Sequence, residues 1–283
     1  MNARGLTVVV ALGALSAAGL AAGAGYPIPV RSEPVVGTYL QGADPLWIDV
    51  VQGRGSTTFE TRAAKTGDVR RQTVAGAFGM AQVGFGSGSI VEGYTRSGRV
   101  VVLPGVPLSY PPTSSRFAVL DSTGGRAPWQ VRLPGWFDYD ALSADGRTLF
   151  LVQHTDQTGD KYNVRAYDLV AKRLLPGAIT DPRDKEVMQG YPQERVVSRD
   201  GRWVYTMYFS NNNGKHNFIH ALDTVRRAAT CTDLPASLRT DFNTHIALSG
   251  HGKIAVKRSS DALAAMVDPI GRTVALRTAA SRP

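Results

Sequence analysis

Two seven-residue stretches decide the fold: LSADGRT at positions 142–148 and VSRDGRW at positions 197–203. Each starts with an apolar residue and a serine, continues with two turn residues and a glycine, and ends with an arginine before an apolar run. Asp-Gly between apolar runs is a strong signal for a β-hairpin, because glycine tolerates the positive φ that a type I′ turn requires. We therefore expect a tight hairpin at each stretch.

Looser copies of the same pattern occur as YTRSGRV at 94–100 and LSGHGKI at 248–254, so the turn glycines recur about every 50 residues. A second pattern, a strand that ends in aspartate, recurs between them at Asp121, Asp168, Asp223 and Asp268. A short turn and another apolar run follow each of these residues. Aspartate at this place is expected to accept backbone N–H bonds in an Asx turn, which is a structural role.

The two patterns together predict units of four strands. In the third unit the expected strands are 139–143, 148–153, 162–167 and 174–179, and a weaker first copy runs over 35–74. Five such units of roughly 50 residues are typical of a β-propeller, in which each four-stranded blade buries its faces against its neighbours. The glycine-rich residues 75–89 are expected to connect two blades. Six blades is the alternative, if 75–115 folds as more than a connection.

The motif SxDGRxLF at 143–150, followed by RAYDL at 165–169, resembles the WD40-like repeats of TolB-type and YVTN-type propellers. The resemblance covers roughly 92–277 and is strongest over 137–179 and 192–235. It implies an all-β propeller similar to the repeat domains of exported bacterial proteins. It implies no particular function, because such propellers serve as scaffolds, binding modules and enzymes.

The N-terminal residues are expected to lie outside the propeller. Arg4 precedes an uncharged apolar run over 6–20, and Ala22-Gly23-Ala24 has the small-x-small pattern of a signal-peptidase site. We expect residues 1–24 to be a cleaved signal peptide and 25–283 to be a single domain, secreted or associated with the cell envelope. An uncleaved anchor is the alternative. No second apolar run of that length follows, so no transmembrane segment is expected after cleavage.

Composition narrows the classes of partner. The chain has a net charge of +9 and a single cysteine, Cys231, so no disulfide can form within it and a buried thiol is expected. Export and the scattered placement of the basic residues argue against nucleic acid as a partner. A protein, a peptide or an anionic component of the cell envelope is the expected class.

Candidate site residues come from aligning the units on their turn glycines. The first strand of each blade lines the central channel, and this register gathers charged residues at the channel mouth: Glu92, Asp138, Asp140, Glu194, Arg195 and His245. They predict a polar mouth that binds a small ligand or a cation. The alternative is an internal ion-pair network, Arg195 with Asp140 or Glu92, because buried charges must be paired.

Two functions remain open on the sequence alone. The first is a non-catalytic exported propeller without a cofactor, which binds a protein, a peptide or a cell-wall component. The second is a propeller enzyme, a lyase or lactonase-like hydrolase, with a divalent cation held by Asp138, Asp140, Glu194 and His245. Three or more of these ligands around one point would favour the enzyme.

Overall fold

The computed structural model describes residues 26–27, 46–63, 65–84, 90–184, 187–210, 217–238, 240–241 and 243–277. Over these residues the protein consists of antiparallel β-sheets, with only two short 3-10 helices, Ala236–Leu238 and Gly250–Gly252. The prediction of an all-β fold is confirmed. The predicted signal peptide lies outside the described residues.

The third and fourth repeat units each form one sheet whose strands follow one another in sequence. The third sheet contains β10 (Phe137–Leu142), β11 (Thr148–His154), β12 (Lys161–Asp168) and β13 (Arg173–Leu174), and β14 (Met188–Gln189) also pairs with β12. The fourth sheet contains β15 (Tyr191–Val197), β16 (Trp203–Phe209), β17 (Phe218–Asp223) and β18 (Ala228–Asp233). These two units have the four consecutive strands that the sequence predicts.

The predicted fourth strand of the third unit, 174–179, is wrong beyond Leu174. Pro176 has no N–H to donate, and Gly177 adopts a positive φ of 79°. The N–H groups of Leu175 and Ile179 still bond to carbonyl oxygens of β12, so the segment follows β12 irregularly instead of as a strand.

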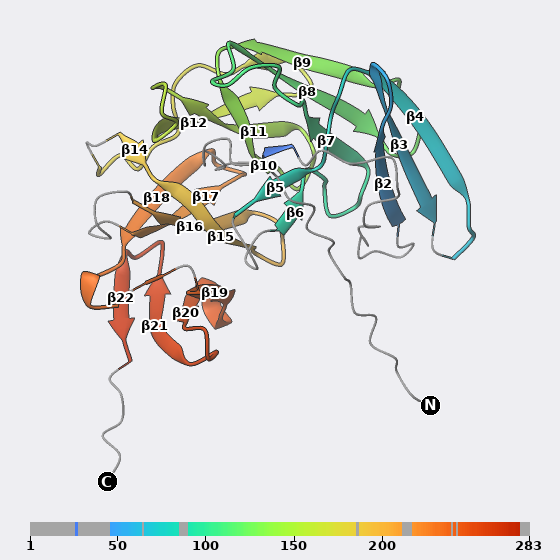
Figure 1. The fold of residues 1–283 in the computed structure, drawn as a ribbon. Helices are drawn as coiled ribbons and strands as arrows, with labels where there is room; N and C mark the ends of the chain where they lie inside the picture. Colours follow the sequence, from blue (N-terminus) through green and yellow to red (C-terminus); the bar gives the residue numbers. More distant parts are fainter. Residues whose placement is uncertain are drawn as a thin grey trace, which may run out of the picture.

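The remaining sheets cover the other three units, but two of them have three strands instead of the predicted four. The first contains β2 (Leu46–Gln52), β3 (Ser56–Ala63) and β4 (Val69–Ala75); the second contains β7 (Val100–Pro104), β8 (Ser114–Asp121) and β9 (Trp129–Pro134); and the last contains β19 (His245–Leu248), β20 (Ile254–Lys257), β21 (Leu263–Asp268) and β22 (Thr273–Leu276). Figure 1 shows the sheets following one another along an arc. β2–β4 and β19–β22 lie at its two ends, so β2 does not pack beside the last unit.

A further small sheet was not predicted. It contains β1 (Tyr26–Pro27), β5 (Ala81–Val83) and β6 (Ile90–Glu92), and β5 contacts both β7 and β15. The chain continues from β6 to Tyr94, which bridges Val101, so β6 leads into the second unit as its inner strand. The prediction that 75–89 is only a connection is therefore wrong: β5 lies on the inner side of the arc (Figure 1).

The hairpin turns differ from the predicted type I′ geometry in three units. Gly98, Gly146 and Gly201 have φ values of 69°, 68° and 72°, but the residues before them do not have positive φ. The loop is longer instead: in the third unit Ser143 Oγ accepts the N–H of Thr148 and donates to Asp145 Oδ1, which accepts the N–H of Arg147. Only the last unit has two successive positive φ values, at His251 and Gly252.

The predicted Asx turns are confirmed. Asp168 Oδ1 accepts the N–H groups of Val170 and Ala171, both at 2.8 Å. Asp121, Asp223 and Asp268 accept backbone N–H bonds from the residues that follow them in the same way. The repeated aspartates therefore fix the turn into the last strand of each unit.

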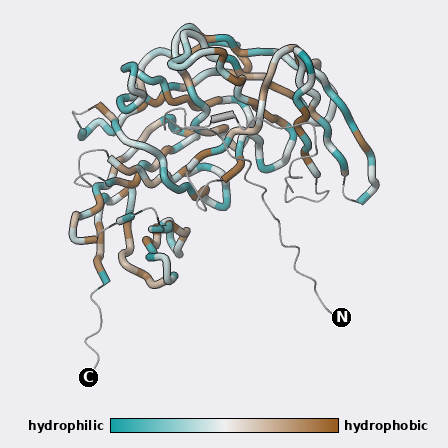
Figure 2. Tube along the Cα trace, viewed as in Figure 1, coloured by the Kyte–Doolittle hydropathy of each residue, from teal (hydrophilic) through white to brown (hydrophobic). Residues whose placement is uncertain are grey.

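The core lies between neighbouring sheets. Along β11, Phe150 and Val152 pack toward the fourth unit, whereas Leu149 and Leu151 pack toward the second. This alternation follows from the strand geometry, in which successive side chains point to opposite faces. Because apolar side chains cover both faces, the strand is a continuous apolar run, and Figure 2 shows hydrophobic residues concentrated on the strands within the arc. Each unit thus depends on its neighbours for burial.

Candidate functional site

The six predicted site residues form three separate groups. Arg195 lies with Glu92 and Asp140, Glu194 lies with His245, and Asp138 pairs with His154. Among the described residues, no three His, Cys, Asp or Glu side chains lie close enough together to hold a metal ion. The structure therefore does not bring Asp138, Asp140, Glu194 and His245 to one point, as the proposed cation site required.

The first group joins the inner strands of three units. Arg195 Nη2 lies 2.6 Å from Asp140 Oδ1, and Arg195 Nη1 lies 3.0 Å from Glu92 Oε2. Nη1 also donates to the backbone carbonyl of Asp140, and Nε donates to Thr206 Oγ1 at 2.9 Å. The residues of this group come from β6, β10, β15 and β16, because the same inner register recurs in each unit. These are the contacts that the alternative interpretation, an internal ion-pair network, expects.

Burial dominates the electrostatics of this group. Arg195 and Asp140 are 2% and 1% exposed. Burial raises the pKa of Glu92, and Arg195 opposes that shift. Burial alone lowers the pKa of Arg195, but Glu92 and Asp140 more than offset it and hold the pKa above its usual value. The guanidinium stays charged, and its donors already have partners within the protein.

The second group connects the fourth unit to the last. Glu194 Oε2 accepts the N–H of Ile246 at 2.6 Å, and Oε1 lies 3.5 Å from Nδ1 of His245. Burial raises the pKa of Glu194. One carboxylate thus bonds to the inner strand of the next unit, which suits a structural link between blades as well as a binding role.

Asp138 lies elsewhere, at the start of β10. Its Oδ2 accepts the indole N–H of Trp136 at 3.2 Å and lies 2.7 Å from Nε2 of His154. The His154 ring stacks on Trp136 with 4.0 Å between centroids, and its Nδ1 lies 3.0 Å from the carbonyl oxygen of Gly159. The indole and the carboxylate are therefore held in fixed positions by their neighbours.

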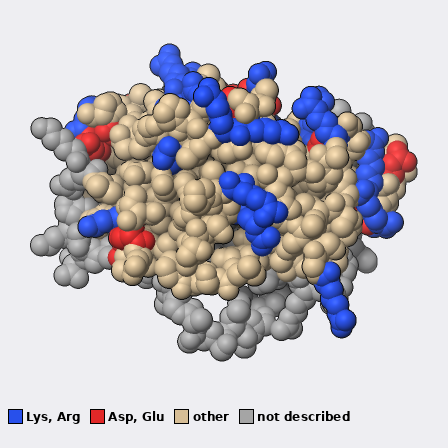
Figure 3. All heavy atoms as spheres, turned by 90° about the horizontal axis from the view of Figure 1, so that it is seen from above, with Lys and Arg blue, Asp and Glu red and all other residues tan. Residues whose placement is uncertain are grey.

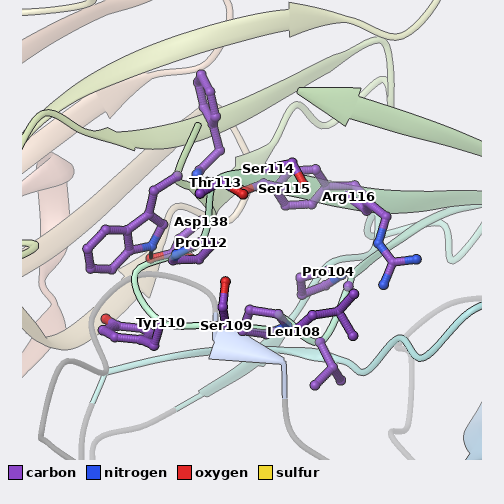
Figure 4. Close-up of a pocket in the computed structure, with 16 residues that line it drawn as sticks. Pro104, Leu108, Ser109, Tyr110, Pro112, Thr113, Ser114, Ser115, Arg116 and Asp138 are labelled. Carbon is purple, nitrogen blue, oxygen red and sulfur yellow. Dashed lines mark hydrogen bonds between the residues drawn. The ribbon is translucent and has the colours of Figure 1, made fainter. Parts of the chain in front are cut away.

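A pocket opens beside this group (Figure 4). Its walls come from residues 104–117, which are the end of β7, the connection to β8 and the start of β8, and from residues 136–138 before and within β10. Tyr110 meets Trp136 edge to face, with 4.9 Å between centroids, and in Figure 4 Arg116 lies at the other end of the pocket from Tyr110. The volume of about 120 Å³ suits one or two side chains of a larger ligand.

Two large apolar residues of the same segment are exposed. Leu108 is 97% exposed and Tyr110 is 47% exposed. The Arg116 guanidinium lies 5.5 Å from the centroid of the Phe78 ring. Figure 4 shows this guanidinium at the edge of the pocket. Aromatic, apolar and charged groups thus surround one pocket.

Sequence reasoning found Asp138 but missed Trp136, His154, Tyr110 and Leu108. The signal was present in VPLSYPPT at 106–113, where large apolar residues stand among prolines between two strands. Prolines keep such a segment out of the sheet, so its apolar side chains stay on the surface.

Cys231 is buried, as predicted, and burial raises its pKa to about 12. Its Sγ lies 3.6 Å from Nδ1 of His220, whose pKa burial lowers to about 4. A thiol with so high a pKa is a poor nucleophile at neutral pH.

The part of the chain that the structure describes contains no helix long and apolar enough to cross a membrane.

No known protein family matches the chain, and no curated protein is similar to it. Solved structures to which the chain is similar include the hydrazine synthase of Kuenenia stuttgartiensis, at 14% identity and a TM-score of 0.44 over 77% of this chain and 53% of that one. TolB from Acinetobacter baumannii matches at 9% identity and a TM-score of 0.42, over 82% of this chain and 50% of that one. An acylaminoacyl peptidase matches at 11% identity and a TM-score of 0.45, over 77% of this chain and 34% of that one.

The chain spans about half the length of the first two of these structures and about a third of the peptidase. The three include both enzymes and a TolB protein. Likenesses this distant identify no activity, substrate or partner for this chain.

Proposed function

We propose that this protein is an exported, non-catalytic β-propeller of five blades, similar to TolB-type propellers, which binds a peptide or protein segment at the pocket beside Asp138. Residues 1–24 act as its signal peptide in this proposal, and residues 25–283 form a single domain. The Arg195 group closes the inner side of the molecule, and the ligand binds between the units at their outer connections.

The observation that carries the proposal is the exposed pair Leu108 and Tyr110 beside a preset Trp136–Asp138 group. Exposure of large apolar side chains to water is unfavourable, and a partner that covers them removes this cost. Clusters of such side chains at a surface therefore mark interaction sites. Aromatic residues are enriched at such sites because they contribute a large contact area with little loss of conformational entropy.

The chemistry of the pocket favours a peptide. Asp138 Oδ2 is engaged by Trp136 and His154, which leaves Oδ1 to accept a peptide N–H or an ammonium group. Arg116 supports a carbonyl or carboxylate at the other end, and Tyr110 and Leu108 cover an apolar side chain. A peptide segment presents polar backbone groups and apolar side chains in alternation, and the polar and apolar groups of this pocket match that pattern.

A selection from a phage library of random 12-residue peptides, followed by calorimetry on the selected peptide, tests the proposal. Tyr110→Ala and Asp138→Asn should each weaken binding by about tenfold or more, as expected for residues at the centre of an interface. The matched control is Tyr94→Phe, an aromatic change outside the pocket, which should leave affinity within about twofold.

Two results would count against the proposal. One is a selection that enriches no peptide over an unrelated folded protein. The other is a selected peptide whose affinity survives both Tyr110→Ala and Asp138→Asn, which would place the site elsewhere. Thermal melts of each variant separate lost binding from lost folding.

A further inference from the structure

The repeat places two turns of each unit at the same end of its sheet. In a four-stranded antiparallel sheet with strands in sequence order, the first and third turns lie at one end and the second turn at the other. We name the end with the first and third turns the turn face; in the last four units it comprises residues 94–99, 121–128, 143–147, 168–173, 198–202, 223–227, 249–253 and 268–272.

Contacts between units hold these turns together. A Cβ atom on Gly146 would lie 2.7 Å from Cγ2 of Val100 in the preceding unit, and one on Gly201 would lie 3.1 Å from Cβ of Ala144. The Arg96 guanidinium donates to the carbonyl oxygen of Arg199, two units away. The turns of successive units therefore form one continuous face.

This face is strongly basic. Its twelve cations are Arg96, Arg99, Arg126, Arg147, Lys172, Arg173, Arg199, Arg202, Arg226, Arg227, Lys253 and Arg272, against six aspartates and no glutamate. The aspartates accept N–H bonds within their own turns. Three of the cations are also paired with carboxylates: Arg99 with Asp121, Arg202 with Asp223 and Arg272 with Asp184. Most of the cations are exposed, and Figure 3 shows that Lys and Arg also outnumber Asp and Glu on the side seen from above.

The same face carries exposed apolar side chains at repeated positions. The second residue after the turn aspartate is Val170, Val225 or Ile270, with exposed fractions of 61%, 68% and 48%. In each turn a cation follows two residues later, at Lys172, Arg227 and Arg272. Three units thus repeat an apolar tip followed by a cation; the cation is exposed at Lys172 and Arg227, whereas Arg272 is half-buried and pairs with Asp184.

We propose that the turn face docks on the surface of a bilayer that contains anionic phospholipids. The cations bind the headgroup phosphates, and the three apolar tips enter the boundary between headgroups and acyl chains. A hydrated polyanion, such as a wall polymer, would use the cations alone and leave the apolar tips in water. The combination therefore favours a lipid surface.

Docking by this face leaves the peptide pocket free. The pocket is built from the connection between β7 and β8 and from the start of β10, which lie at the other ends of their sheets. The lipid proposal does not depend on the pocket, and neither proposal needs the other.

Co-sedimentation of the full chain with vesicles tests the proposal, using pure phosphatidylcholine and phosphatidylcholine with about a third phosphatidylglycerol. The chain should bind the anionic vesicles more tightly, and binding should weaken as salt rises through the range where screening becomes strong. Binding to the neutral vesicles measures the contribution of apolar residues without the anionic headgroups, and the part from residues 6–20 is shared by every variant.

Two triple variants probe the two parts of the face. Arg147→Gln, Arg226→Gln and Lys253→Gln together should lower the partition coefficient on anionic vesicles by about tenfold or more. Val170→Ser, Val225→Ser and Ile270→Ser together should weaken the binding that persists at high salt. The matched control neutralises three exposed cations at the opposite ends of the sheets: Arg132→Gln, Lys161→Gln and Arg258→Gln.

Equal losses in the control and in the Arg147 triple would overturn the proposal, as would equal binding of the wild-type chain to both kinds of vesicle. A third outcome also contradicts it: the Ser triple binds vesicles like wild type, and soluble poly(glycerol phosphate) displaces the protein from them. That result would make the face a binding site for an anionic polymer. Circular dichroism of each variant confirms that it is folded.

Discussion

Arg195 is the residue at which the inner strands of three units meet. Its side chain is buried, and it bonds to Glu92, Asp140 and Thr206 from neighbouring strands. Register alone suggested this meeting, because Glu92, Asp140 and Arg195 occupy the same place in successive repeats. The sequence offered a pair of Arg195 with Asp140 or Glu92, and the structure has both. That one guanidinium would reach both carboxylates could not be predicted, since that depends on how far each side chain reaches across the inner edge.

Removing Arg195 should destabilise the fold strongly. Arg195→Ala leaves the buried carboxylate of Asp140 and the partly buried one of Glu92 without their cation, and losing one partner of a buried pair costs about 3–5 kcal/mol. Adding Asp140→Ala should restore part of that loss. Urea unfolding of both single variants and the double variant measures the coupling, and near-wild-type midpoints for all three would show that the group is solvated and open.

His220 should make stability depend on pH. Burial lowers its pKa to about 4, whereas an unfolded histidine titrates near 6.5, so between these values the unfolded state binds more protons. The free energy of unfolding should therefore fall as pH drops from about 6.5 to 4, by up to about 3 kcal/mol from this residue. Below pH 4 its contribution stays constant.

The measurement is urea unfolding of wild type and His220→Gln across this pH range. The variant should lose the part of the pH dependence that His220 supplies, although Asp140, Arg195 and Asp181 near it remain. Identical pH profiles for the two proteins would show that the histidine is solvated in the folded state.

At the scale of the element, a turn glycine can be required for two reasons: a positive φ and the lack of space for a Cβ atom. Gly146 has a positive φ of 68° and leaves no space for a Cβ beside Val100, whereas Gly177 has a similar φ of 79° but nothing within 4 Å. Gly146→Ala and Gly177→Ala therefore share the backbone strain of about 1 kcal/mol, and only the first adds a clash between units.

We expect Gly146→Ala to lower the free energy of unfolding by about 1–3 kcal/mol more than Gly177→Ala. Chemical denaturation of the two variants compares them directly. Equal losses would mean that the turns of neighbouring units do not pack as described.

The sequence predicted strands well where two signals agreed. The strand predicted over 148–153 is observed as Thr148–His154, because the turn motif marks its start and an apolar run fills it. The prediction from sequence missed β5, which is three residues long and lies in a glycine-rich stretch. Its burial depends on contacts with β7 and β15, which belong to other parts of the chain. The pocket was missed for a similar reason, since Trp136 and Tyr110 meet only after two units have packed.

At the scale of the whole molecule, the repeat produces two different ends. The turns gather cations and apolar tips because each unit repeats the same turn sequence. The other end carries the pocket, because the connections there are free to vary in length and composition. β5 and the Arg195 group lie on the inner side, and the proposed ligand binds at the outer connections.

Hydrogen–deuterium exchange of the full chain, with and without the selected peptide, tests the central claim most directly. The amides of 104–117 and 136–138 should exchange more slowly in the complex, while β6, β15 and the turn face should not change. Protection centred on β6, β10 and β15 around Arg195, with none over 104–117, would place the ligand on the inner side and contradict this account.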